Sequence, residues 1–210
     1  MTVRQYSYEN GVVRVSFDGS KCAHAGYCFR ELPGVFDGDR NPPINLAGGS
    51  LAEIVRVVER CPSSALVYER LDGGADEVPD EQATVTLIPN GPLAVRGELA
   101  LDSATYTRLT LCRCGQSARK PFCDGSHKTH RFDDLKTAAA ETIGADLPGG
   151  PVSFSPAPDG PVLFSGSLTV KLRNGDVLCA REKGALCRCG ESKNKPFCDG
   201  THRSIGFSAP

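Results

Sequence analysis

The stretch C-R-C-G-Q-S-A-R-K-P-F-C-D-G-S-H, from Cys112 to His127, returns 75 residues later as C-R-C-G-E-S-K-N-K-P-F-C-D-G-T-H, from Cys187 to His202. Each copy supplies three thiols and one imidazole at the spacing C-x-C-x8-C-x3-H. Thiolates and imidazoles are ligands of zinc and of iron–sulfur clusters, so four of them in one short segment can close around a metal centre. Because the set occurs twice at one spacing, we interpret both copies as metal sites.

The spacing alone leaves the kind of metal centre open. A structural zinc ion held by three cysteines and one histidine is one alternative. A disulfide fits poorly, because two cysteines separated by one residue do not bridge comfortably and cytosolic thiols stay reduced. Four residues without any metal would require the same coincidence twice.

The composition is that of a loop-rich chain with thin hydrophobic cores. Trp is absent and aromatic residues make up 7%, while there are 23 Gly and 15 Pro. Thin cores are often reinforced by metals or disulfides. The chain has no long apolar run and no apolar segment directly after Met1, which predicts a cytoplasmic protein without a membrane span or secretory signal. A net charge of −1 argues against nucleic-acid binding.

Turn and periodicity signals divide the chain into strands, one clear helix and two linkers. Residues 4–18 predict a β-hairpin around Asn10-Gly11, and residues 50–60 predict a helix with Ser50 as N-cap and Glu53 completing a capping box. Further strands are expected at residues 65–68, 84–88, 93–99, 162–172 and 177–179. Residues 73–79 and 138–159 are polar or Ala-, Gly- and Pro-rich and are interpreted as linkers, the second with room for a short helix. Within the first motif, Asp124 is expected to be the N-cap of a helix that carries His127.

The whole repeated string, C-x-C-x2-S-x3-P-x-C-D-G-[S/T]-H, resembles the CDGSH iron–sulfur domain of the mitoNEET group. Both copies match at every position, with Ser117 and Ser192 at the internal serine. The resemblance implies one [2Fe–2S] cluster in each copy. It further implies that the first two cysteines hold one iron and the third cysteine and the histidine hold the outer one. The implied ligands are Cys112, Cys114, Cys123 and His127 in the first copy and Cys187, Cys189, Cys198 and His202 in the second.

The ligand set has consequences for the chemistry of such a cluster. Replacing one thiolate by a neutral imidazole removes a negative charge, which should raise the reduction potential above that of an all-cysteine cluster. A protonated imidazole cannot ligate, so acid should loosen the outer iron. We therefore expect redox-active, acid-labile centres.

The resemblance also implies an assembly. Family members with one motif are homodimers that exchange strands to form a β-cap. We therefore predict an α+β, β-rich protein in which two CDGSH modules, residues 80–137 and 160–210, pack as an intramolecular pseudo-dimer within a monomer. Strands that form a β-cap, a cluster-binding loop and a short helix would make up each module.

Three of the remaining cysteines lie in the N-terminal segment, which we assign to a domain at residues 1–72. Cys22, Cys28 and Cys61-Pro62, together with the intervening helix, resemble divergent single-cluster ferredoxin domains. The resemblance implies an α+β ferredoxin-like domain with an additional cluster. Ala25 stands where the usual pattern has a cysteine. Three thiolates suit a [3Fe–4S] cluster or a [4Fe–4S] cluster with a further ligand, for which His24 is the nearest candidate. The alternative is that the three cysteines belong to the core.

These observations predict an iron–sulfur protein for electron transfer, redox and pH sensing, or cluster transfer. Its partner would be a redox protein or a cluster acceptor. The chain has no nucleotide-binding glycine loop and no G-x-S-x-G motif, so we do not expect an enzyme. The alternative is a zinc-stapled interaction module with structural Cys/His sites and no redox function.

Overall fold

The computed structural model of the chain describes residues 5–134 and 147–209. The chain divides into two compact units, Met1–Val78 and Pro79–Pro210. Unit 1 and unit 2 are described separately below.

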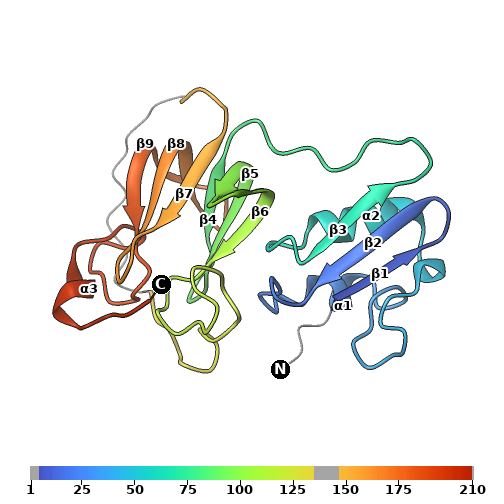
Figure 1. Cartoon of the computed structure of the whole chain (residues 1–210), viewed down its shortest axis with the longest axis horizontal. Coiled ribbons are helices and arrows are strands. Elements are labelled where there is room, and N and C mark those ends of the chain that lie inside the picture. Colours follow the sequence, from blue (N-terminus) through green and yellow to red (C-terminus); the bar gives the residue numbers. More distant parts are fainter. Residues whose placement is uncertain (1–4, 135–146, 210) are drawn as a thin grey trace. The chain divides into compact units, whose positions relative to one another are not determined.

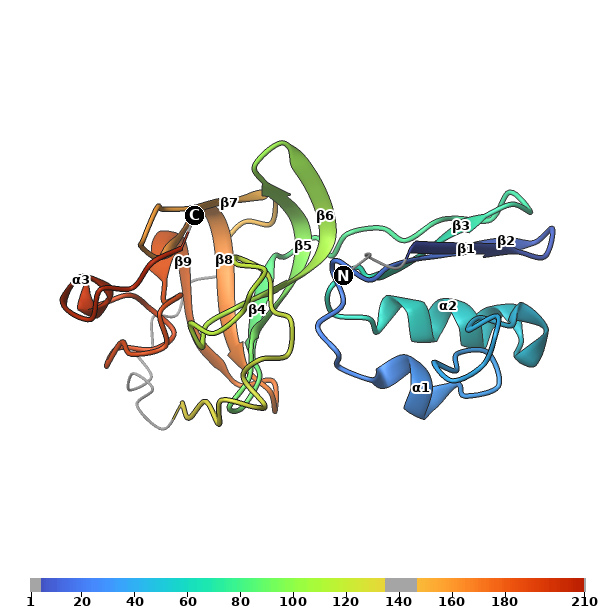
Figure 2. The ribbon, with the colours of Figure 1, turned by 60° about the horizontal axis from the view of Figure 1, so that its bottom comes forward.

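Unit 1 is a three-stranded antiparallel sheet with helices packed on one face. The sheet has the order β1-β2-β3 (Figure 1), and its strands are β1 (Gln5–Glu9), β2 (Val13–Asp18) and β3 (Leu66–Arg70). Helices α1 (Tyr27–Glu31) and α2 (Leu51–Glu59) lie on the same side of the sheet (Figure 2). A short 3-10 helix, η1 (Leu46–Gly48), precedes α2. The N-terminal hairpin is confirmed, because β1 and β2 pair around residues 10–12.

The start of α2 follows the expected capping box. The side chain of Ser50 accepts from the N–H of Glu53, and the Glu53 carboxylate accepts from the N–H of Ser50. Ile54, Val57 and Val58 are buried on the face of α2 that meets the sheet. The helix predicted at residues 50–60 is therefore confirmed.

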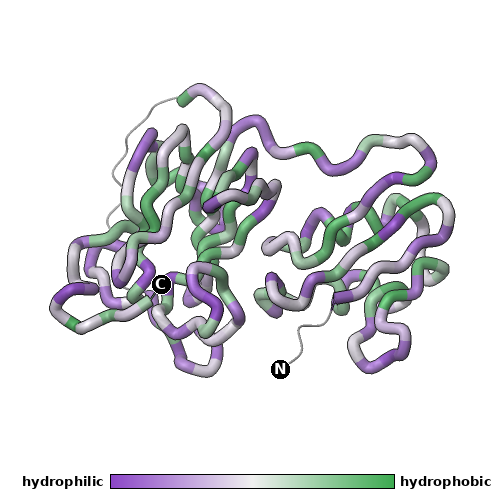
Figure 3. Tube along the Cα trace, in the orientation of Figure 1, coloured by the Kyte–Doolittle hydropathy of each residue, from purple (hydrophilic) through white to green (hydrophobic). Residues whose placement is uncertain are grey.

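Unit 2 is a six-stranded sheet to which both sequence copies contribute three strands. The first copy supplies β4 (Thr84–Leu87), β5 (Leu93–Leu101) and β6 (Ala104–Leu111). The second supplies β7 (Val152–Pro156), β8 (Val162–Leu172) and β9 (Val177–Leu186). The protein is therefore β-rich, as expected. Hydrophobic stretches follow these strands in Figure 3, and many of the connecting loops are hydrophilic.

The pairing within unit 2 alternates between the copies. β4 and β5 pair antiparallel, as do β7 and β8. The first strand of each copy also pairs in parallel with the long middle strand of the other, β4 with β8 and β7 with β5. These four strands thus form a closed cycle of pairings, and β6 and β9 extend it as hairpin partners of β5 and β8. The side chains inside form one hydrophobic cluster drawn from both copies.

Two strands, β6 and β7, were not among the strands expected from the sequence. Residues 152–156 lie in the expected second linker but form β7, because their alternating apolar side chains are buried in the core of unit 2. The short helix considered within residues 138–159 falls partly on residues 135–146, outside the described residues.

The helix expected to begin at Asp124 does not form. Residues 126–131 are a run of turns, and in the second copy a single helical turn, α3 (Thr201–Ser204), begins after Gly200. The Asp124 carboxylate accepts from the N–H of Ser126, and Asp199 makes the same bond to Thr201 in the second copy. The residue after each aspartate, Gly125 or Gly200, has positive φ, which is not a helical conformation, so the aspartate does not directly precede a helix. Among the described residues, no helix combines the length and apolar character needed to span a membrane.

Candidate iron–sulfur sites

Main-chain hydrogen bonds bring the first and third cysteines of each motif together at a strand end. After β6, the N–H of Cys112 donates to the carbonyl of Pro121 and the N–H of Cys123 donates to that of Thr110, both at 2.8 Å. The second copy repeats both bonds after β9 at 2.8 Å, from Cys187 to Pro196 and from Cys198 to Ala185. The loop between the cysteines therefore folds back onto its own strand, so the first and third cysteines become neighbours.

The four predicted ligands of each motif are arranged as two pairs. In the first copy, the Sγ atoms of Cys112 and Cys114 lie 3.7 Å apart, and Cys123 Sγ lies 3.4 Å from His127 Nδ1. The second copy gives 3.8 Å for Cys187 and Cys189 and 3.3 Å for Cys198 and His202. Two thiolates bound to one tetrahedral metal at about 2.3 Å lie about 3.8 Å apart, and a thiolate and an imidazole about 3.6 Å. Each pair therefore has roughly the separation of two ligands on one metal atom. We call the two sets site 1 and site 2.

The internal serine fixes the loop of each site. Ser117 Oγ donates to the carbonyl of Phe122 at 2.7 Å and accepts from the N–H of Arg119 at 3.0 Å. Ser192 makes the same two bonds, to Phe197 at 2.7 Å and from Asn194 at 3.0 Å. Both serines are buried, so these bonds satisfy main-chain groups that water does not reach. The serine of the motif is therefore a structural support for the residue that precedes the third cysteine.

The acid–base properties of site 1 suit metal ligation. The pKa of Cys112 is lowered to about 6, because its sulfur accepts hydrogen bonds from the Cys114 thiol and from nearby main-chain N–H groups. The pKa of Cys114 moves the opposite way, since it keeps the shared proton. Burial, together with the charge of Lys128, lowers the pKa of His127 and favours the neutral imidazole that a metal requires.

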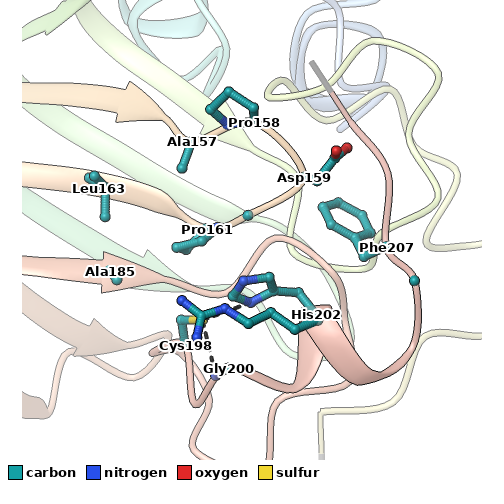
Figure 4. A pocket seen from close by; sticks show the side chains of 13 residues that line it. Ala157, Pro158, Asp159, Pro161, Leu163, Ala185, Cys198, Gly200, His202 and Phe207 are labelled. Carbon is teal, nitrogen blue, oxygen red and sulfur yellow. Dashed lines mark hydrogen bonds between the residues drawn. The ribbon is translucent and has the colours of Figure 1, made fainter.

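The inner and outer pairs differ in their access to solvent. The C-x-C cysteines of both sites are buried, whereas His127 and His202 are half-buried. A hollow of about 670 Å³ lies beside the outer pair of site 2 and is lined by Cys198, His202 and Phe207 among others. Figure 4 shows the His202 ring in this hollow, next to Cys198. The histidine side of site 2 is therefore the side that another molecule can approach.

The two sites contact each other through their C-x-C loops. A Cβ atom on Gly115 would lie 2.3 Å from the carbonyl oxygen of Cys189, and one on Gly190 would lie 2.7 Å from that of Cys114. Both glycines have positive φ, 78° and 90°. Only glycine tolerates both the backbone conformation and this close approach. The inner ligands of the two sites are therefore separated by little more than packed main chain.

Buried cations surround this contact, and the sequence did not identify them as buried. Arg113 and Arg188, the middle residues of the two C-x-C motifs, and Lys195 are each 1% exposed. The aromatic ring of Phe132 lies 5.4 Å from the Arg113 guanidinium and 5.9 Å from Lys195 Nζ. The second copy mirrors this arrangement, with Phe207 5.6 Å from Arg188 and 5.7 Å from Lys120. In the sequence, an arginine within C-x-C and a lysine before the proline recur in both copies. Recurrence alone does not distinguish a solvated side chain from a buried one.

The structure also brings together the three N-terminal cysteines. Cys22, Cys28 and Cys61 line one small cavity between the β2 end, α1 and the start of β3. Burial raises the pKa of Cys28 to about 11, and the charges of Cys61 and Cys22 add to the shift. Ala25 also lines this cavity. His24 is exposed and is not among the described residues that line it.

Comparison with family models agrees with this arrangement of sites. Residues 90–128 and 159–203 match a family described as an iron-binding zinc finger of the CDGSH type. Residues 8–71 match a family described as a divergent 4Fe-4S mono-cluster. A search of curated proteins and a search of solved structures each gave no match.

The class of the protein follows from the paired thiolate and imidazole ligands and from these matches: it binds iron–sulfur clusters. More particularly, the chain carries two CDGSH regions preceded by a divergent 4Fe-4S mono-cluster domain.

Proposed function

We propose that the protein is an electron-transfer protein with two [2Fe–2S] clusters, at sites 1 and 2, and a third cluster in unit 1. The observation that carries the proposal is the division of each ligand set into two chelating pairs. A single zinc ion would need all four ligands around one point, whereas among the described residues no three or more His, Cys, Asp or Glu side chains are grouped so that they could hold one metal ion. Two pairs instead suit two metal atoms, one with two thiolates and one with a thiolate and an imidazole. A bound cluster of this kind supplies reversible one-electron chemistry.

The surroundings of the ligands support electron transfer rather than catalysis. The buried C-x-C cysteines and the fixed loops hold the ligands in place without room for a substrate at the inner iron. The half-buried histidines face outward, where a protein partner can reach them. We therefore propose a non-enzymatic, cytoplasmic carrier whose partner is a redox protein.

We further infer that sites 1 and 2 form an intramolecular pseudo-dimer. The support comes from the parallel pairing of β4 with β8 and of β7 with β5, in which each copy lends its first strand to the other. The reciprocal Gly115 and Gly190 contacts have the same two-fold pattern. A monomer would then contain the packing that single-motif chains obtain by dimerisation.

For unit 1 we propose a [3Fe–4S] cluster on Cys22, Cys28 and Cys61. Ala25 lines the cavity and stands where the usual ferredoxin pattern has a cysteine, so the motif supplies three thiolates. The expected gain from Ala25→Cys is about one iron per chain, with conversion to a four-thiolate cluster. Unchanged iron content in this variant, with the thiol accessible to alkylation, would contradict the assignment of the cavity.

Anaerobic purification with iron, sulfide and zinc counting tests the main proposal. We expect about seven irons per chain and red-brown protein whose visible bands bleach with dithionite. Electron paramagnetic resonance should then show two reduced [2Fe–2S] signals. Colourless protein with two zinc ions per chain would instead support the alternative, an interaction module with structural zinc sites and no redox function.

A second candidate, donation of a [2Fe–2S] cluster, is favoured by one observation. The outer pair of site 2 borders the hollow at His202, so the iron held there is the more accessible one (Figure 4). Incubation of the loaded protein with an apo [2Fe–2S] ferredoxin, followed by separation and iron analysis, tests this role. Transfer within minutes would favour donation, and retention of both clusters would favour a carrier of electrons.

A further inference from the structure

Two arginines of unit 1 pack on one aromatic ring at the wall of the N-terminal cavity. Tyr27, the first residue of α1, lines the cavity that the three cysteines share. The guanidinium carbons of Arg30 and Arg60 each lie 5.3 Å from the centre of its ring. Arg30 also donates from Nη2 to the carbonyl of Ala25, another residue of the cavity wall, at 2.9 Å. Arg60 is followed directly by Cys61. Two positive charges are therefore attached to the wall of the predicted cluster site.

A third arginine, on α2, shares a carboxylate with Arg60. Glu31 of α1 pairs with Arg56 and with Arg60, both at 3.2 Å. Among the described residues, Glu31 is the one carboxylate that pairs with these three arginines. Arg30, Arg56 and Arg60 are all exposed, and α1 and α2 lie on the same side of the sheet (Figure 2). We call these three arginines, with the ring of Tyr27, the arginine face.

The arginine face contrasts with the rest of unit 1. Residues 1–78 carry 8 Lys/Arg against 11 Asp/Glu, a net charge of −3. Outside the face, Arg14 pairs with both Glu9 and Glu69, and Arg70 pairs with Asp72. The face is therefore a local positive region on an acidic unit.

The other two carboxylates of α2 have partners of their own. Glu53 accepts from the N–H of Ser50 at 2.8 Å and completes the capping box. Glu59 accepts from the Tyr68 hydroxyl at 2.8 Å. Neither of them forms an ion pair with an arginine of the face.

The chemistry of this face suits a carboxylate-rich protein surface. A guanidinium group presents five N–H donors in a plane, which match the two oxygens of a carboxylate. The three exposed side chains use only part of these donors on Glu31 and Ala25. Phosphate groups would match the same donors, but the net charge of −1 argues against a nucleic acid as the partner. Local positive charge instead orients an acidic protein as it approaches.

Resting on the function proposed above, we propose that the arginine face of unit 1 is the docking site of a redox protein whose own cofactor is surrounded by carboxylates. One electron then passes between the cofactor of the partner and the N-terminal cluster. One of them is oxidised and the other reduced, and no bond forms or breaks. Tyr27 belongs both to the face and to the cavity wall, so it packs between the docked partner and the cluster. The arginines bind the partner and are not ligands of the cluster.

Rapid-mixing kinetics with a reduced acidic flavodoxin test the proposal. The loaded full chain is used under anaerobic conditions, and the flavin hydroquinone supplies one electron. Freeze-quench electron paramagnetic resonance separates the N-terminal cluster from sites 1 and 2. We expect the second-order rate constant for reduction of the N-terminal cluster to fall as salt is added, because salt screens the attraction to the arginine face. The net charge of the chain alone predicts a rise, since two acidic proteins repel each other.

Variants matched in charge give the sharper test. Arg30→Gln/Arg60→Gln removes two charges from the face and should lower the rate constant at low salt by at least about tenfold. Arg14→Gln/Arg70→Gln removes two charges from elsewhere in unit 1 and serves as the control, with a clearly smaller change. Arg30→Lys/Arg60→Lys keeps the charge and should recover part of the rate. Reduction by photogenerated 5-deazaflavin radical, an uncharged donor, should be equally fast in all of these proteins if the cluster itself is unaltered.

The outcomes separate this inference from the function on which it rests. A rate constant that rises with salt, or equal rates in Arg30→Gln/Arg60→Gln and its control, would overturn the inference and leave the N-terminal cluster standing. Binding of a DNA oligonucleotide that requires the same arginines would assign the face to phosphate groups and overturn it as well.

A further variant guards against poor loading of Arg30→Gln/Arg60→Gln. Arg56 is 53% exposed and is not among the residues that line the cavity, so Arg56→Glu leaves the cluster site intact. Its reversed charge should also slow the reaction with flavodoxin by about tenfold. An unchanged rate in Arg56→Glu would overturn the inference. Absence of a cluster from unit 1 of the parent protein would overturn both the inference and that part of the proposed function.

Discussion

The N-terminal site and the duplicated sites bring their predicted ligands together by opposite routes. Sites 1 and 2 each draw all their ligands from one short loop, which main-chain bonds and a buried serine pin to a strand end. The N-terminal site takes Cys28 from α1, Cys22 from the loop before it and Cys61 from beyond α2. The duplicated sites should therefore depend on local contacts, and the N-terminal site on the whole fold of unit 1.

The largest effect that tests this comparison is the loss of one ligand. Cys112→Ser should remove one cluster, about two irons and two sulfides per chain, while the N-terminal signal remains. Iron and sulfide analysis with electron paramagnetic resonance measures both. Cys179→Ser is the matched control, because Cys179 is buried but lies outside every motif, and it should keep the full iron content. Loss of all clusters in Cys112→Ser would show that the three sites are not independent.

The next effect is a cavity in the core of unit 1. Ile54 is 1% exposed, so Ile54→Ala should lower the free energy of unfolding of unit 1 by about 2–5 kcal/mol. Because the N-terminal site depends on that fold, its cluster should be lost at lower urea concentrations while sites 1 and 2 keep theirs. Val67→Ala removes a side chain that is 41% exposed on the same unit and should change little. If all three clusters were lost at the same urea concentration, the N-terminal site would depend on the fold of unit 1 no more than sites 1 and 2 do.

A smaller effect is expected from the loop support of site 2. Ser192→Ala leaves the Phe197 carbonyl and the Asn194 N–H without their buried partner, a cost of about 1–3 kcal/mol. Iron release from site 2 to a chelator should become faster, with site 1 unchanged. Ser204→Ala, which removes an exposed hydroxyl bonded to the Thr201 carbonyl, serves as the control. Equal release from the two variants would show that the serine does not hold the loop.

The smallest effect concerns the N-cap of α2. Ser50→Ala should destabilise unit 1 by about 1 kcal/mol, because one end of the capping box is lost. Urea unfolding of unit 1, followed by the absorbance of its cluster, would detect this as a lower midpoint. Ser7→Ala on exposed β1 gives the reference value. A midpoint equal to that reference would mean that the cap contributes nothing to the N-terminal site.

The sequence predicted what depends on local chemistry. The Asn10-Gly11 hairpin, the capping box at Ser50 and the long strands of unit 2 follow from turn residues and from periods of 2 and 3.6. The ligand pairs could also be anticipated, because all four residues of each set lie in one short motif. Resemblance to known motifs, rather than spacing, distinguished iron from zinc.

What the sequence did not predict depends on tertiary contacts. Residues 152–156 were expected to be linker. They form β7 by pairing with β5 and β8, and no local sequence pattern specifies those pairings. The burial of Arg113 and Arg188 requires carbonyls from turns that lie more than 20 residues away, which no local pattern specifies. In the first motif, Asp124 makes the hydrogen bond of an N-cap, but Gly125 follows it at positive φ and residues 126–131 form turns rather than a helix.

The alternating strand order of unit 2 has a consequence for how the chain is made. During synthesis β4, β5 and β6 leave the ribosome first, but the parallel neighbour of β4 is β8, which ends at Leu172. Synthesis proceeds at roughly 5–20 residues per second, so several seconds pass between the synthesis of the site 1 cysteines and that of β8, which completes their sheet. Until then the first copy exposes unpaired strand edges and reduced thiols. The first copy therefore depends on protection of these edges and thiols until β8 has been synthesised.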